Sequence, residues 1–271
     1  MRTNNPVLNN LPAASQGANT YGQQNLNNPY GAPAQPQAPQ QLTDRPMTVD
    51  DVVTKTGITL AVIVVFAIAN FALAQVNPGL AMLLTLVGGI AGFITVLVHA
   101  FSARARGPVT TLIYAVFEGL FVGGISLIFS GALVGGADAG SLIGQAVLGT
   151  IGVFLGMLFV YKTGAIRVTP KFTRFITAAV IGVAVLALGN LVLALFFDMN
   201  PLRDGGPLAI VFSIVCIGLA ALSFLQDFDM ADKLIRANAP SKMAWSVALG
   251  LAVTLVWLYT EILRLLSYFR N

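Results

Sequence analysis

Long apolar runs separated by short polar segments make up the chain from about residue 48 onward. A helix needs about 20 mostly apolar residues to cross the hydrocarbon core of a bilayer. Seven runs reach this length, and they cover residues 56–75, 79–101, 109–131, 142–163, 174–197, 207–228 and 244–269. Turn-forming residues such as "NPG" at 77–79 and "NPLRDGGP" at 200–207 separate them. The pattern predicts an all-α bundle of seven transmembrane helices.

The first part of the chain has a different composition. Residues 1–47 are rich in Asn, Gln, Pro, Ala and Gly, and a segment this polar cannot bury enough surface to offset the entropy of ordering. We therefore expect a disordered tail over 1–47 and a membrane domain over 48–271. Over the whole chain 56% of residues are hydrophobic and only 10% are charged, whereas soluble domains carry about 25% charged residues. This composition excludes an ordinary soluble protein.

Basic residues concentrate in alternate connections between the predicted helices. The segment before the first helix and the second, fourth and sixth connections carry most of them: Arg45, Lys55, Arg104, Arg106, Lys162, Arg167, Lys171, Lys233, Arg236 and Lys242. Since short basic loops remain in the cytoplasm, we expect a cytoplasmic N-terminus. Arg264 and Arg270 lie near an end that would then be outside. A re-entrant last segment, with both termini cytoplasmic, is therefore an alternative.

Four acidic residues fall within or at the ends of the apolar runs. Glu118 lies about ten residues into the third run, about 15 Å along a helix. Glu261 lies within the seventh run, and Asp227 and Asp229 lie at the end of the sixth. A carboxylate at bilayer depth costs at least ~2.5 kcal/mol, and such residues often mark an ion or proton path.

Each of these acids also has a purely structural explanation. Glu261 can pair with Arg264, its i,i+3 neighbour on the same helix. Glu118 can be a protonated, hydrogen-bonded packing residue, and Asp229 can be solvated at the cytoplasmic face. His99, the single histidine, is expected to be an interfacial residue with a satisfied side chain rather than a pH sensor.

A functional interpretation joins two of the acids. Two carboxyl groups in contact at low dielectric cannot both ionise easily, so the pair tends to hold one shared proton. Loss of that proton adds repulsion, which opens the contact or recruits a cation. Several hard oxygen ligands favour calcium. The acids therefore point to a proton-gated cation path.

Three stretches resemble the transmembrane Bax-inhibitor family, which includes bacterial calcium-leak members. They are "SFLQD" ending at Asp227, "WLYTEILRLL" around Glu261, and "SARARGPVTTLIYAVFEGL", which leads into the third helix. The resemblance covers roughly residues 50–271 and implies a central last helix surrounded by the other six. It also implies that Asp227 and Glu261 form a pH-sensing latch and a calcium site, with Arg104 or Arg106 beside them. Asp229 competes with Asp227 for the first position.

The spacing of the two acids leaves their contact open. In a hairpin that turns near Pro240, Asp227 lies 13 residues before the turn and Glu261 lies 21 residues after it. The difference corresponds to ~12 Å of helix. The acids meet only if the turn is displaced, the last helix is broken, or its start lies along the membrane surface. Alternatively, Glu261 faces Glu118.

These features lead us to expect a pH-sensitive cation leak in a bacterial cytoplasmic membrane, with calcium as the expected ion. Protons, cations and the lipid bilayer are the expected partners, with no nucleic acid and no bound cofactor. No nucleophile–base set or zinc site is apparent, so we do not expect an enzyme. One rival is a non-conducting regulator or scaffold that binds another membrane complex, such as a quality-control protease. Another is a proton-coupled transporter of a small solute.

Overall fold

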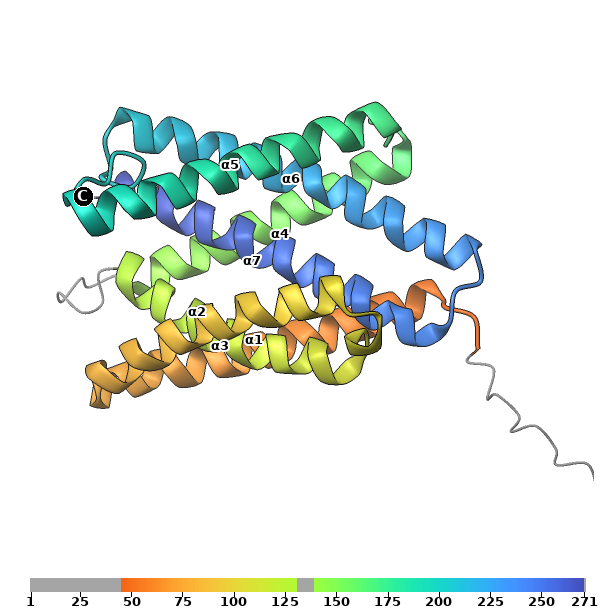
Figure 1. Ribbon diagram of the computed structural model, residues 1–271, viewed down its shortest axis with the longest axis horizontal. Helices are drawn as coiled ribbons and strands as arrows, with labels where there is room; N and C mark the ends of the chain where they lie inside the picture. Colours follow the sequence, from red (N-terminus) through yellow and green to blue (C-terminus); the bar gives the residue numbers. More distant parts are fainter. Residues whose placement is uncertain (1–44, 131–138, 271) are drawn as a thin grey trace, which may run out of the picture. The chain divides into compact units, whose positions relative to one another are not determined.

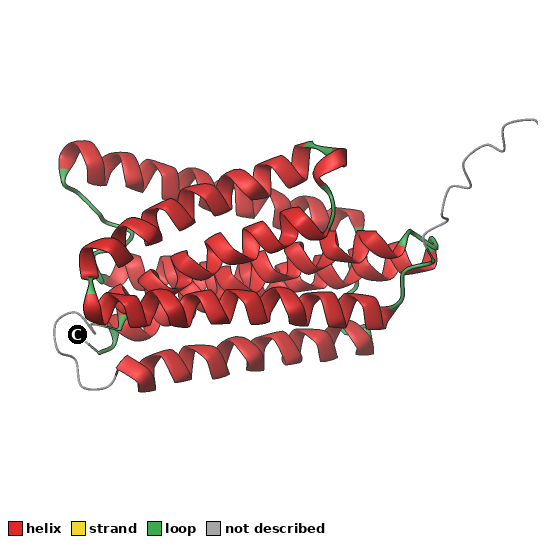
Figure 2. Ribbon diagram, turned by 90° about the horizontal axis from the view of Figure 1, so that it is seen from below, coloured by secondary structure: helices red, strands yellow, loops and turns green. Residues whose placement is uncertain are grey.

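The computed structural model describes residues 45–130 and 139–270 of the 271-residue chain. Seven long helices in these ranges are apolar enough to cross a membrane, as the sequence predicts (Figures 1 and 2). They are α1 (Val49–Val76), α2 (Pro78–Phe101), α3 (Pro108–Phe129), α4 (Ala139–Thr163), α5 (Pro170–Phe197), α6 (Pro207–Arg236) and α7 (Ala244–Tyr268). Two single-turn helices, η2 (Ala103–Ala105) and η4 (Ser241–Met243), precede α3 and α7.

Local sequence signals set where the helices begin. Proline occupies the first turn of α2, α3, α5 and α6, where its missing N–H costs no hydrogen bond. Pro108 and Pro207 are the first residues of α3 and α6. Helix α1 begins at a capping box: Thr48 Oγ1 accepts from the Asp51 N–H, and the Asp51 carboxylate accepts from the Thr48 N–H.

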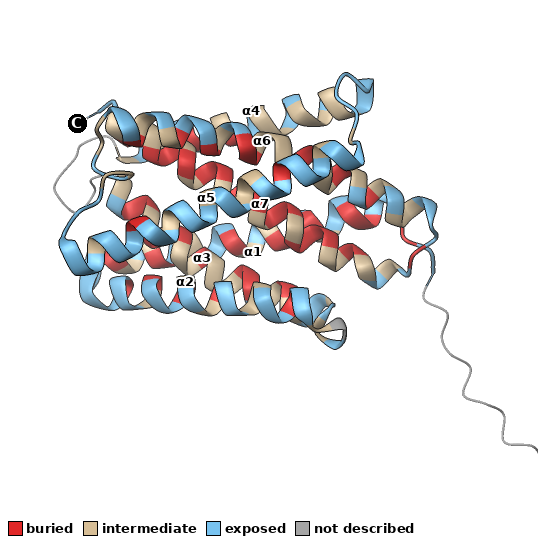
Figure 3. Cartoon of the chain, turned by 45° about the horizontal axis from the view of Figure 1, so that its top comes forward, coloured by how far each residue is buried: buried red, intermediate tan, exposed pale blue. Residues whose placement is uncertain are grey.

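Helix α7 occupies the centre of the bundle. It packs on α1, α3, α4 and α6. In its most apolar stretch 61% of the residues are buried, against 6% in the corresponding stretch of α5. Buried residues occur on every side of α7, whereas α5 is exposed along most of its length (Figure 3). The expected central last helix is therefore present.

Small residues allow three of the helices to approach closely. A side chain at Gly119 of α3 would lie 2.6 Å from the Ile63 carbonyl oxygen of α1. One at Gly88 of α2 would lie 2.6 Å from the Phe117 carbonyl oxygen of α3. Small residues serve this purpose in membrane bundles because lipid supplies no hydrophobic force between helices. The Gly152–Gly156 pair of α4 differs: apart from α4's own backbone, no atom of the described residues lies within 4 Å of the Cβ position at either glycine.

The folded part of the chain begins before α1. The Met47 N–H donates to the Ala239 carbonyl (2.8 Å) and the Ser241 N–H donates to the Arg45 carbonyl (2.9 Å). Pro46 and Pro240 form an isolated antiparallel bridge there, and the Met47 side chain is 2% exposed. Residues 45–47, which the sequence assigns to the tail, therefore join the turn between α6 and α7. The remainder of the predicted tail, 1–44, lies outside the described residues.

Candidate functional site

The contact between α6 and α7 includes an acidic side chain without a cationic partner. Thr254 Oγ1 donates a 2.7 Å hydrogen bond to Asp227 Oδ2. The carboxyl group also lies beside Gly250, one turn earlier on α7, where a Cβ would be in ordinary van der Waals contact with Asp227 Oδ1 at 3.9 Å. Within residues 45–130 and 139–270, no Lys, Arg or His forms an ion pair with Asp227. A half-buried carboxyl group is thus held by a neutral hydroxyl.

Glu261 has the opposite kind of partner. Arg264 Nη1 donates to both Glu261 carboxylate oxygens at 2.9 Å, and both side chains are buried. The guanidinium carbon of Arg264 also lies 5.4 Å from the centre of the Phe129 ring. This is the i,i+3 pair that the sequence offers as the structural explanation of Glu261. The charge of Glu261 is compensated within its own helix.

The predicted contact between Asp227 and Glu261 is not formed in this structure. Asp227 meets α7 at Thr254, seven residues before Glu261, which is about 10 Å along the helix. Two conditions that would allow the contact are not met: α7 is continuous from Ala244 to Tyr268, and the turn stays near Pro240. The register of the hairpin therefore places a threonine, and no second acid, opposite Asp227.

Further polar groups gather around the Glu261–Arg264 pair. Arg203, in the connection between α5 and α6, interacts electrostatically with both residues. Ser213 Oγ of α6 approaches Glu261 without hydrogen-bond geometry, and Ser213 Oγ, Arg264 Nε and the Tyr268 hydroxyl are buried without partners in the described part of the chain. Buried polar atoms of this kind are usually satisfied by internal water. The end of the bundle that holds Glu261 is thus a buried polar cluster.

Glu118 lies on a different side of α7 from Asp227, against α2. A Cβ at Gly92 would lie 3.1 Å from Glu118 Oε2. Thr111 Oγ1 of α3 donates to the Trp245 carbonyl of α7 at 3.1 Å, which sets the register of these two helices. Seven residues further along each helix, Glu118 lies at the level of Ala252, close to that of Thr254. Glu118 and Asp227 therefore share one layer of the bundle, and Glu118 does not pair with Glu261.

The comparison with known families covers nearly the entire chain. Residues 5–271 match the family described as Bax inhibitor 1 like. The chain belongs to this family. No curated protein matches the chain. The seven apolar helices and the family together make this an integral membrane protein.

In this Bax inhibitor 1-like chain the two arginines expected beside the acid latch lie elsewhere. Arg104 and Arg106 are exposed on the turn between α2 and α3, and Arg106 Nη2 donates to the Ala100 carbonyl at 3.3 Å. Neither arginine pairs with Asp227 in the described residues. The expected role of these arginines at the latch therefore has no contact to support it.

The other two candidate residues have simple surroundings in this family member. Asp229 pairs with Lys233 at 2.5 Å across one turn of α6, as the structural explanation anticipates. His99 Nε2 lies 3.0 Å from Ser246 Oγ of α7, within hydrogen-bond distance. Asp229 is thus paired on its own helix, whereas His99 has a partner at Nε2 and none at its buried Nδ1 among the described residues.

Sequence analysis did not identify three residues of the polar sites, Thr254, Ser213 and Arg203. A signal for Thr254 exists: it lies seven residues before Glu261, hence on the same face of the helix. A symmetric hairpin about Pro240 also places residue 253, the neighbour of Thr254, opposite Asp227. Ser213 and Arg203 had no such signal, since their positions depend on the connection between α5 and α6.

A preformed calcium cage is not visible in the described ranges. No three His, Cys, Asp or Glu side chains gather there closely enough to hold a metal ion. The two predicted ligands, Asp227 and Glu261, bind Thr254 and Arg264 instead. Any cation at these acids would therefore be held one carboxylate at a time, with water completing its shell, as suits a passing ion.

Proposed function

We propose that this membrane protein is a pH-sensitive cation leak, with calcium as the candidate ion, in which the Asp227–Thr254 contact holds the closed state. The observation that carries this proposal is an acid within a membrane span whose partner is a hydroxyl group. An ionisable side chain at such a position lowers the stability of the membrane-inserted helix, and such residues often mark an ion or proton path. The family supports a membrane protein, and the ion and the gating are our inference.

The proposed gate responds to the charge on Asp227. A neutral carboxyl group needs only its hydrogen bond with Thr254, and α6 and α7 stay together. An ionised carboxylate in a region of low dielectric requires a compensating charge, and no cationic side chain supplies it in the described residues. A permeant cation can do so. Flux is therefore expected to rise as the pH rises.

The two other acids of the bundle are placed differently. Glu118 shares the layer of Asp227 but lies on another side of α7, against Gly92 of α2, so it is not expected to bind the same cation as Asp227. Glu261 lies nearer the other end of α7 and is already neutralised by Arg264. A cation passing Glu261 has to compete with that guanidinium. The shared-proton pair of Asp227 and Glu261 is accordingly replaced by two separate acids.

Orientation follows from the basic residues. The connections α2–α3, α4–α5 and α6–α7, together with the helix ends beside them, carry nine of the fifteen Lys and Arg residues. The three connections lie at one end of the bundle (Figure 1), and the Arg45 carbonyl accepts from the Ser241 N–H in the last of them. By the positive-inside rule we place this end, and the N-terminus, in the cytoplasm of a bacterial cell. The Glu261–Arg264 pair then lies toward the outer face.

Calcium flux into reconstituted vesicles tests the proposal. Wild-type protein should pass calcium at a rate that increases with pH, and Asp227→Asn should lose most of that dependence. Glu261→Gln should alter the rate, because it removes the partner of a buried arginine. Asp229→Asn is the matched control, since Asp229 lies two residues away and pairs with Lys233. Wild-type pH dependence in Asp227→Asn would overturn the gate.

A second candidate function is a regulator or scaffold that binds another membrane complex, such as a quality-control protease. Its support is the open face of α4, where no described residue of another helix lies within 4 Å of the Cβ positions of Gly152 and Gly156. Faces with small residues at this spacing allow a partner helix to dock. Correctly folded protein without flux at any pH favours this function. Loss of partner cross-linking in Gly152→Leu and Gly156→Leu, with flux unchanged, would assign binding to α4.

A further inference from the structure

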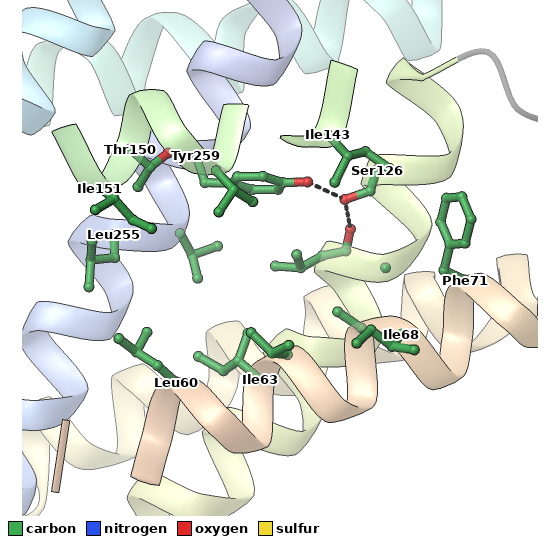
Figure 4. A pocket seen from close by; sticks show the side chains of 16 residues that line it. Leu60, Ile63, Ile68, Phe71, Ser126, Ile143, Thr150, Ile151, Leu255 and Tyr259 are labelled. Carbon is green, nitrogen blue, oxygen red and sulfur yellow. Dashed lines mark hydrogen bonds between the residues drawn. The ribbon is translucent and has the colours of Figure 1, made fainter. Parts of the chain in front are cut away.

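A deep apolar groove lies between α1, α3, α4 and α7, away from Asp227 and from the Glu261–Arg264 pair. Its volume is about 430 Å³, and its floor is formed by Leu255, Val256 and Tyr259 of α7 (Figure 4). The walls come from the middle of α1, the last two turns of α3 and the first half of α4. The groove thus extends from the middle of α7 toward the end of the bundle where α3 ends and α4 begins.

The described residues that line the groove include no charged side chain, and their hydroxyl groups form hydrogen bonds within the protein. Ser126 Oγ and the Tyr259 hydroxyl lie 2.7 Å apart in a hydrogen bond. Thr150 Oγ1 donates to the Ala146 carbonyl at 2.7 Å. Among the described residues, the groove therefore offers a lipid headgroup no charge and no hydroxyl group without a partner. Apolar cavities of this type stay dry and bind apolar molecules, as a cavity of ~150 Å³ already does for benzene in another protein.

The groove opens sideways between α1 and α4. Both helices pack on α7 but make little contact with each other. Val64 and Ile68 of α1 and Val147 and Ile151 of α4 line the groove and are 54%, 63%, 41% and 48% exposed. Because these helices span the membrane, the opening meets lipid chains and not water.

We propose that this groove holds one acyl chain of a bilayer phospholipid, which enters between α1 and α4 and reaches the floor on α7. An empty groove would deprive its lining of dispersion contacts on one side, and a hydrocarbon chain restores them. The internal hydrogen bonds of the hydroxyl groups mean that binding depends on the chain and not on the headgroup. This site is independent of the proposed cation path.

A phospholipid with a photoactivatable diazirine in its acyl chain tests the proposal in proteoliposomes. Leu255 and Val256 are only 9% and 8% exposed, so lipids that merely surround the protein do not reach them. After irradiation, peptide mass spectrometry should find label on this part of α7. Phe224 and Leu225 of α6 are fully buried outside the groove and should remain unlabelled. This measurement needs only the wild-type protein. Equal labelling of α7 and of the α6 control residues, or no label on α7, would overturn the proposal.

Neighbouring substitutions then localise the effect. Val147→Trp and Val64→Trp fill the groove, and we expect each to reduce α7 labelling several-fold. Leu148→Trp and Val65→Trp add the same ring at adjacent positions that are 71% and 61% exposed and lie outside the lining, so labelling should persist. Similar labelling in both sets, measured in variants that elute as the wild type does, overturns the proposed site.

Discussion

Two buried or half-buried carboxyl groups along α7 are held in opposite ways. Glu261 is held by two hydrogen bonds from Arg264, on its own helix. Asp227 reaches across from α6 and meets only the hydroxyl of Thr254. The first arrangement neutralises charge within one helix and does not depend on how helices pack. The second joins two helices through a neutral hydroxyl group. In the proposed gate it is therefore the second contact that controls the separation of α6 and α7.

The largest effect should come from removing the cation at Glu261. Arg264→Met leaves a buried carboxylate without its partner, and this should lower the free energy of unfolding by about 3–5 kcal/mol. Thermal unfolding in detergent measures the loss. Combining Arg264→Met with Glu261→Gln removes both charges and should recover most of the stability. A double variant as unstable as the single one would show that the loss arises from packing around Arg264.

A smaller effect is expected at the hydroxyl that holds Asp227. Thr254→Val removes one hydrogen bond while keeping the shape of the side chain, and should cost about 0.5–1.5 kcal/mol. Because this contact holds the closed state in the proposed gate, its loss should also raise the flux at low pH. Thr254→Ser keeps the donor and should behave as the wild type in both measurements. An unchanged flux profile in Thr254→Val would separate this contact from gating.

The smallest effect belongs to the acid nearest to Asp227 in sequence. Asp229→Asn breaks an i,i+4 ion pair with Lys233 near the end of α6. Pairs of this kind contribute about 0.3–0.5 kcal/mol, and added salt should abolish the difference. Unfolding at low and high salt provides the measurement. A loss comparable to that of Arg264→Met would mean that Asp229 is also part of a buried network.

The polar sites show how far local rules reach. The Glu261–Arg264 pair is an i,i+3 contact, so the spacing in the sequence is sufficient to propose it. The partner of Asp227 lies 27 residues away, beyond a turn. Counting from Pro240 gives nearly the right position, residue 253, but not whether the turn is displaced. Arg203 and Ser213 join the Glu261 cluster through tertiary packing and have no local signal.

Hydropathy and length along the chain were sufficient to determine seven spanning helices. Each apolar run has to satisfy its own backbone hydrogen bonds in lipid, so helix formation is decided locally. The starts of α3 and α6 at Pro108 and Pro207 are also decided locally, because proline lacks the N–H that a position inside a helix would use. Only the tertiary structure decided which partner each acid meets and where the groove on α7 opens. Those features depend on the register between distant helices, where a shift of two turns replaces Glu261 by Thr254 opposite Asp227.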